Sequence, residues 1–168
     1  LSAQKNEKNI KILTKNIEAL GGKPNLESKN PKDLIKGLTK QLEKLSVSKI
    51  LNDKSKNIIK DDTINNIKVR FQKIYDLPPK ELRSLVDKGK KEIGNGLIII
   101  FTSKDDKVGL AVGVTTKLIS KYDAVRFVKL GAEVIGGKGG GGRSDFAQAG
   151  GILENKIDEA FEKLKVLI

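Results

Sequence analysis

The chain has 168 residues, enough for one or two small domains, and a formal charge of +12 at pH 7. It contains no Cys and no His, which excludes disulfides and thiolate metal sites and removes the usual general base and zinc ligand. No apolar run is long enough to span a bilayer and no signal-peptide pattern is present, so we expect no membrane partner. Because Met is also absent, the sequence is expected to be a fragment of a longer protein.

The positive charge predicts a polyanionic partner, and a nucleic acid fits that description best. Residues 1–60 carry 14 lysines against 6 acidic residues, whereas the excess is smaller over residues 61–168. A composition rich in Lys, Asn and Ile is also typical of an AT-rich genome. The charge alone therefore favours nucleic-acid binding and leaves a purely compositional origin open.

Residues 1–60 are predicted to form a helical arm followed by a connection. Apolar residues recur with helical spacing in two segments, which Gly21-Gly22 separates. Asn30-Pro31 offers an N-cap and a first-turn proline for the second helix. We expect an antiparallel hairpin or a coiled-coil arm. The two apolar stripes are Ile10, Leu13, Ile17 and Leu20, then Ile35, Leu38, Leu42 and Leu45.

Four lysines of the second helix step four residues at a time and so share one face. A solvated face explains this row better than a specific ladder of phosphate contacts. Residues 46–61 are polar and carry no clear period, which predicts a connection. The four lysines are Lys32, Lys36, Lys40 and Lys44.

Residues 61–168 are predicted to form a globular α/β domain with a glycine-rich loop. Apolar and polar residues alternate over residues 67–72, which predicts a half-buried strand. Pro78-Pro79 opens a helix that Gly94 ends. The continuous apolar run from Leu97 to Phe101 is typical of a central strand.

The next strand, Val108 to Val114, alternates large residues with glycine and alanine, so one of its faces is nearly bare. We expect a helix to cover that face. Asp123 then caps a helix that leads into the glycine-rich loop, and a last amphipathic helix follows Gly151. The predicted fold class is α/β, a mixed sheet flanked by helices, with an N-terminal helical hairpin or coiled-coil arm.

The segment from Gly136 to Gly151 holds eight of the 17 glycines and is the strongest candidate for a site. Glycine lets backbone N–H groups turn toward a ligand, and cations beside such amides favour an anion. Arg143 can bind a phosphate with two parallel N–H donors, and Lys138 adds a point charge. The predicted RNA-binding residues are Lys138, Gly139, Gly140, Gly141, Gly142, Arg143, Asp145 and Gln148.

Other interpretations of this segment are weaker. The GxGxxG and nucleotide-loop patterns both match, but those loops leave a strand, whereas this one leaves a helix. Asp145 has no His or second acid beside it for hydrolysis, so no catalytic residue, metal or cofactor is predicted. Asp145 is expected to position Arg143 or to cap backbone amides. Gln148 either binds a sugar hydroxyl or base edge or holds the loop, and Phe146 is expected in the core rather than stacked on a base.

The run Arg143-Ser-Asp-Phe-Ala-Gln-Ala-Gly-Gly151 closely resembles the signature near the C-terminus of alanyl-tRNA synthetases, in the domain called C-Ala. A domain of the same type follows the catalytic domain of DHH phosphoesterases. The commoner family form has one glycine fewer before the arginine and a proline where Ser144 stands. The resemblance covers roughly residues 62–168 and includes, upstream, residues 80–87, 97–101 and 107–114.

This resemblance implies a non-catalytic, tRNA-binding part of a larger alanine–tRNA ligase. In that family the domain grips the elbow of tRNA, where the D and T loops meet, so that aminoacylation and editing act on one tRNA. The implied partners are alanine-specific tRNA, the rest of the parent synthetase and, as in some members, a second copy forming a homodimer. The expected location is cytoplasmic. Two alternatives stay open: an oligonucleotide-binding accessory domain of a DHH phosphoesterase, and a structural dimerisation arm.

Overall fold

Five α-helices and six strands follow one another along the 168 residues, all of which the computed structural model describes. By its internal contacts the chain divides into two units, Leu1–Asn52 and Asp53–Ile168. The first unit contains two helices and the connection between them, and the second contains the whole sheet. The mixed sheet and the N-terminal helical arm are therefore both as the sequence predicts.

The first unit consists of α1 (Ser2–Ala19) and α2 (Pro31–Asn52). One apolar side chain of each predicted stripe, Ile17 and Leu38, is fully buried. The side chain of Asn30 accepts a hydrogen bond from the N–H of Lys32 at 2.9 Å, which is the predicted N-cap of α2.

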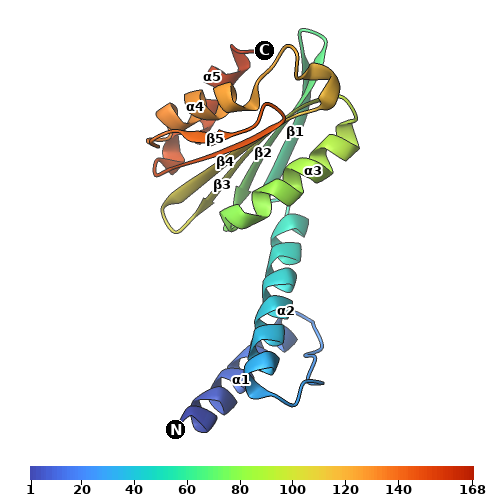
Figure 1. The fold of residues 1–168 in the computed structure, drawn as a ribbon, viewed down its shortest axis with the longest axis vertical. Helices are drawn as coiled ribbons and strands as arrows, with labels where there is room; N and C mark the ends of the chain where they lie inside the picture. The colour runs from blue at the N-terminus through green and yellow to red at the C-terminus, as the bar shows by residue number, and fades with distance from the viewer. The chain divides into compact units, whose positions relative to one another are not determined.

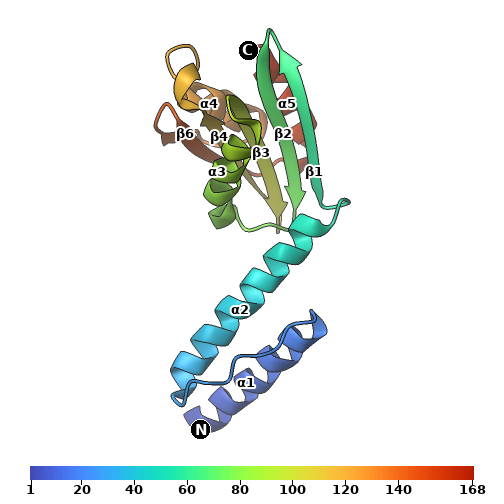
Figure 2. The same ribbon diagram turned by 90° about the vertical axis from the view of Figure 1, so that its right-hand side faces the viewer.

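The two helices do not form an antiparallel hairpin, so that alternative is wrong. The connection between them is extended and runs back along α2, so that α1 and α2 point in the same general direction (Figures 1 and 2). Gln41 holds this return segment, because its side chain donates to the carbonyl of Lys23 at 2.7 Å and accepts from the N–H of Asn25 at 3.1 Å. A Cβ placed on Gly22 would lie 2.5 Å from Leu45, so the end of α1 meets the middle of α2.

The predicted connection over residues 46–61 is also wrong in most of its length. Helix α2 continues to Asn52, and strand β1 (Asn57–Ile64) begins soon afterwards. Strand β1 is an edge strand whose residues are almost all exposed, so no face of it needs to be apolar. Its sequence therefore lacks the alternation by which a strand is recognised.

The second unit contains one six-stranded sheet in the order β1-β2-β3-β4-β6-β5. Strands β2 and β3 pair in parallel, and every other neighbouring pair is antiparallel. Two-residue turns join β1 to β2 and β3 to β4, and their four central residues have positive φ, as tight hairpin turns require. The remaining strands are β2 (Ile67–Tyr75), β3 (Gly96–Lys104), β4 (Lys107–Val114), β5 (Gly140–Gly142) and β6 (Phe146–Gly151).

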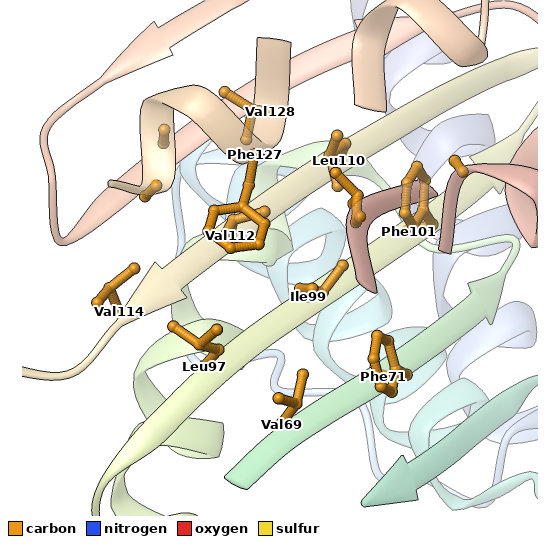
Figure 3. Close-up of a cluster of buried hydrophobic side chains, with 14 of the residues drawn as sticks. Val69, Phe71, Leu97, Ile99, Phe101, Leu110, Val112, Val114, Phe127 and Val128 are labelled. Carbon is orange, nitrogen blue, oxygen red and sulfur yellow. The ribbon is translucent and has the colours of Figure 1, made fainter. Parts of the chain in front are cut away.

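Helices α4 (Ala124–Val134) and α5 (Ile157–Lys165) cover one face of the sheet, opposite to the face that α3 covers (Figure 1). Asp123 caps α4 as expected, because its carboxylate accepts from the N–H of Val125 at 3.0 Å. Short 3-10 helices lie at Pro79–Glu81, Thr116–Leu118 and Glu154–Lys156. The core under α4 and α5 is shown in Figure 3 and includes Val69, Phe71, Leu97, Ile99, Phe101, Leu110, Val112, Val114, Phe127 and Val128.

Helix α3 (Leu82–Ile93) lies on the opposite face and fills the bare side of β4. A Cβ added to Gly113 would overlap Val86 of α3, and one added to Gly109 would lie 3.2 Å from Leu82. The expectation that a helix covers this face is confirmed. Gly94 ends α3 with a φ of 77°, a backbone conformation that favours glycine.

Because helices cover both faces, β2 is more buried than its alternating pattern predicts. Arg70 and Gln72 on the α3 side are both buried. The guanidinium of Arg70 donates two hydrogen bonds to Asp61 of β1, at 2.8 and 3.0 Å, and a third to Glu92 of α3. These charged partners let an arginine occupy a buried position and raise its pKa further, with the Asp61 hydrogen bond outweighing the opposing effect of burial.

Candidate nucleic-acid interface

The glycine-rich segment is partly a strand rather than an open loop. Residues Gly140–Gly142 form β5, which pairs with β6 at the edge of the sheet, and residues 143–145 make the turn between them. Arg143 and Phe146 exchange both backbone hydrogen bonds, at 2.8 and 3.2 Å. A strand made of glycine has no side-chain period, which is why the sequence did not reveal it.

The fit of this segment against β6 explains several of its glycines. A Cβ on Gly137, Gly140 or Gly142 would overlap a backbone carbonyl oxygen of Gly150, Gln148 or Phe146, respectively. A Cβ on Gly141 would meet nothing within 4 Å. Glycine is thus required at these three positions because two backbones approach closely, a reason that is independent of any ligand.

The pairing also limits which amides are free to bind an anion. Arg143 and Phe146 form a hydrogen-bonded pair, so the alternation of an antiparallel ladder makes Gly141 and Gln148 the next such pair. The N–H groups of Gly140 and Gly142 then point away from β6, toward the open edge. The ladder therefore removes the amide of Gly141 from the four that the sequence suggested for an anion cradle.

Three hydrogen bonds from other elements hold the turn of this hairpin. The ammonium of Lys90 in α3 donates to the carbonyl of Asp145 at 2.9 Å, and the N–H of Val114 donates to the same carbonyl at 2.9 Å. The N–H of Ala124, at the start of α4, donates to the carbonyl of Ser144 at 3.0 Å. The turn is therefore fixed to both faces of the sheet.

Arg143 projects from this fixed turn into solvent. Its Nε lies 3.8 Å from a carboxylate oxygen of Asp145, and the Arg143 side chain is 73% exposed. So long and exposed a pair contributes little to stability and leaves the guanidinium donors available. Lys138 is exposed as well, and the structure gives it no ion-pair partner.

Gln148 lies away from the turn, in the middle of β6. It stands opposite Ala111 of β4 and Gly141 of β5, and its residue is half-buried. Opposite residues of an antiparallel pair share a face, so Gln148 lies on the α3 face of the sheet. Phe146 is buried, as expected, and the guanidinium of Arg83 in α3 lies 4.8 Å from its ring centre.

A pocket of about 580 Å³ opens beside the turn, and the sequence did not reveal it. Three lysines line it, Lys90 and Lys91 from the end of α3 and Lys117 from the segment after β4. Asp145 is the only carboxylate in its lining. Lys90 and Asp145 are 55 residues apart, so no local pattern brings these residues together.

Polar groups of the same pocket are already ordered. The hydroxyl of Thr115 accepts from the N–H of Gly96 at 2.9 Å and donates to the side-chain oxygen of Asn95 at 2.9 Å. Hydrogen bonds thus hold Asn95, Gly96 and Thr115 in place, and the positive charge of the lining comes from Lys90, Lys91 and Lys117. A hydrogen-bonded wall with a net positive lining fits a phosphate-bearing ligand.

No group of three or more acidic side chains is placed so that it could hold a metal ion. None of the helices combines the length and apolar character needed to cross a membrane.

A mixed sheet with one helix on one face, two on the other and a glycine-rich hairpin at its edge defines a small α/β domain. The chain belongs to the family of the DHHA1 domain, whose model matches residues 66–168. This agrees with the span of roughly 62–168 expected from the sequence.

Several relatives of this chain are alanine–tRNA ligases, and each match covers only part of the enzyme. The chain is 46% identical over 103 residues to an alanine–tRNA ligase of Parvibaculum lavamentivorans and 43% identical over 106 residues to that of Rhodopseudomonas palustris. These matches cover 61% and 62% of the chain but only 12% of each relative, so the chain spans about an eighth of their length. A crystal structure of the C-Ala domain from Aquifex aeolicus alanyl-tRNA synthetase superposes with a TM-score of 0.61 at 30% identity, covering 64% of the chain and 96% of that domain.

Proposed function

We propose that this chain is a non-catalytic, tRNA-binding C-terminal part of an alanyl-tRNA synthetase. The single observation that carries the proposal is the fixed turn of the β5–β6 hairpin, with exposed Arg143 beside a pocket of three lysines. The similarity to alanine–tRNA ligases and to a C-Ala domain supports tRNA as the polyanion.

In this proposal the contacts are mainly to phosphates. Arg143 supplies two parallel donors to one phosphate, and Lys138 and the edge amides of Gly140 and Gly142 bind around it. Gln148 binds a sugar hydroxyl or base edge on the α3 face. Asp145 orients Arg143 through their exposed pair.

The proposed role within the parent synthetase is the one that the resemblance implies. The contacts of residues 61–168 are made to the elbow of alanine-specific tRNA, while the helical arm over residues 1–60 adds positive charge. Gripping the elbow lets aminoacylation and editing elsewhere in the parent synthetase act on one tRNA. Pairing with a second copy and a cytoplasmic location complete the proposal.

The proposal is tested by filter binding of tRNA to the full chain. Affinity should fall steeply between about 50 and about 200 mM salt, with log K losing roughly 0.9 or less per unit of log salt for each phosphate neutralised. Replacing Arg143 by Ala should weaken binding by about 1–2 kcal/mol, and Arg143→Lys should restore only part of the loss. Lys163→Ala removes the same charge from α5 on the opposite face and is the matched control.

Two results would contradict the proposal. The first is a flat salt response, which would show that phosphates do not dominate. The second is an equal effect of Arg143→Ala and Lys163→Ala, which would place the RNA elsewhere. The elbow assignment has its own test, since a minihelix that lacks the D loop should bind more weakly than whole tRNA.

A further inference from the structure

A second pocket lies at the other end of the sheet, between α5 and the outer strands β1 and β2. Its volume is about 430 Å³, within the range of roughly 300–1,000 Å³ that is typical of small-ligand sites. Three aromatic side chains line it, Phe71, Tyr75 and Phe161. The whole chain has only 5 Phe and 2 Tyr, so nearly half of its aromatic rings gather here.

Two of these rings are fixed by the core. Phe161 packs edge-to-face on Phe71, with ring centres 5.6 Å apart, and on Phe101, with centres 4.9 Å apart. Tyr75 is half-buried and packs against none of the other aromatic rings. The pocket thus has an aromatic wall fixed by the core and one further ring, Tyr75, that packs on no other aromatic ring.

Lysines surround this aromatic surface. The ammonium of Lys73 lies 5.1 Å from the ring centre of Tyr75, and that of Lys165 lies 5.2 Å from the ring centre of Phe71. Both also pair with acids of α5, Lys73 with Asp158 at 3.6 Å and Lys165 with Glu162 at 2.8 Å.

Lys60 differs from the other two lysines because it is exposed on β1 and has no ion-pair partner. Its position opposite Phe71 in the β1–β2 ladder puts it at the rim of the aromatic wall. The pocket therefore combines an aromatic surface with one unpaired cation at its edge.

A ligand that fits both features has a flat ring system joined to a phosphate. A free inorganic anion would leave the aromatic wall unused, and a plain apolar ligand would leave Lys60 unpaired. We propose that this pocket takes one unpaired base of a bound RNA, stacked on Tyr75 with its phosphate near Lys60. This inference rests on the proposed function in its choice of RNA as the partner.

The chain has no Trp and only two tyrosines, so its intrinsic fluorescence gives a direct test. In a Tyr122→Phe variant of the full chain, all tyrosine emission comes from Tyr75. We expect a hexamer of riboadenosine to quench this emission in a saturable way, because a stacked base lies against the ring. A hexamer with the same phosphates but without bases should not quench it.

Affinity measurements give the second test. Tyr75→Leu keeps an apolar side chain but removes the ring, and it should weaken binding of the riboadenosine hexamer roughly 5- to 100-fold. Lys60→Ala, on an exposed edge strand, should weaken it several-fold without disturbing the fold. Tyr75→Leu should alter binding of the baseless hexamer much less than binding of the riboadenosine hexamer, because only the latter has a base to stack. Equal effects of Tyr75→Leu on both probes, or no saturable quenching, would overturn the inference.

The outcome for the Tyr75 pocket can be told apart from the outcome for the proposed function. If Arg143→Ala weakens tRNA binding while the riboadenosine hexamer leaves Tyr75 emission unchanged, base binding at Tyr75 is wrong and phosphate binding at Arg143 stands. If the riboadenosine hexamer quenches Tyr75 emission while Arg143→Ala leaves tRNA binding unchanged, base binding at Tyr75 stands and phosphate binding at Arg143 is wrong.

Discussion

At one edge of the sheet, β5 presents three glycines, whereas at the other edge β1 presents eight residues that all carry side chains. The glycine edge is held mainly by backbone groups, through the β5–β6 ladder and the bonds to the turn, and by one side-chain donor, the ammonium of Lys90. The β1 edge is held in addition by side chains, chiefly the guanidinium of Arg70 between Asp61 and Glu92.

This difference decides what each edge tolerates. At the glycine edge, steric fit is strict, and the exposed side chains of Arg143 and Lys138 contribute little to the fold, so these two cations are available to a ligand. At the β1 edge, side-chain size is less constrained but a specific ion pair matters. Substitutions at the glycine edge should therefore lower stability when they add side-chain volume, and substitutions at the β1 edge when they remove a charge.

The largest effect is expected for Gly140→Ala. The new Cβ would overlap the carbonyl oxygen of Gln148 and lie 2.6 Å from the Cβ of Ala149, so β5 must separate from β6. The free energy of unfolding should fall by about 2–3 kcal/mol in chemical denaturation. Gly141→Ala is the matched control, with an expected change within about 0.5 kcal/mol. Equal losses in the two variants would show that steric fit is not what requires glycine here.

A smaller effect is expected for Lys90→Met, which keeps the apolar stem and removes the ammonium. The carbonyl of Asp145 then loses a charged donor at 2.9 Å but keeps the N–H of Val114. The expected loss is about 1 kcal/mol in the free energy of unfolding. Lys91→Met, on the next residue, should leave stability unchanged, and a loss as large as that of Lys90→Met would argue against a specific bond.

The β1 edge should respond to pH. The hydrogen bond from Arg70 holds the pKa of Asp61 below its usual value of 3.8, despite the opposing effect of burial. A carboxylate whose pKa is lower in the folded state stabilises the fold above its unfolded pKa, and this contribution is lost as the pH falls through the folded pKa. Asp61→Asn should cost about 1 kcal/mol at pH 7, discounted for the exposure of Asp61.

Denaturation of both proteins at two pH values measures this contribution. The difference between Asp61→Asn and the parent chain should shrink below about pH 4, because the parent carboxylate is then protonated. A difference that stays constant into acid would show that shape rather than charge is responsible.

The smallest effect is expected for Asp145→Asn at the glycine edge. Its pair with Arg143 is long and exposed, so stability should change by less than about 0.5 kcal/mol. Thermal unfolding of this variant and of Asp61→Asn under the same conditions compares one ion pair from each edge. A loss at Asp145 as large as the loss at Asp61 would mean that the turn depends on the ion pair between Arg143 and Asp145.

Local patterns were sufficient for most of the elements. The apolar run of β3, the bare face of β4 and the caps at Asn30 and Asp123 each depend on neighbouring residues, so the sequence alone indicated them. The two edge strands were missed or read as connections, because neither has a buried face that would impose alternation. The direction of α1 relative to α2 was also wrong, since it depends on bonds between Gln41 and a segment 16 to 18 residues away.

The candidate site was predictable only in part, for the same reason. Arg143 and the glycines are neighbours in sequence and could be recognised together. The lysines of the pocket come from α3 and from the segment after β4, and only the folded sheet brings them to Asp145. The aromatic pocket was hidden in the same way, because Phe71 and Phe161 are far apart along the chain.

The strand order indicates which edge of the sheet unfolds locally most easily. Strands β1–β2, β3–β4 and β5–β6 are each neighbours in sequence, whereas the β4–β6 pairing joins Val108 to Gly151 across a loop of about forty residues. Closing that loop costs more entropy than forming any of the adjacent pairs, and the glycines of β5 add to the cost. We expect amide hydrogens of β6 to exchange with solvent sooner than those of β3, through local opening of this edge. If RNA binds at Arg143 as proposed, its binding should slow the exchange of the β6 amide hydrogens, so hydrogen exchange at this edge would measure how much RNA is bound.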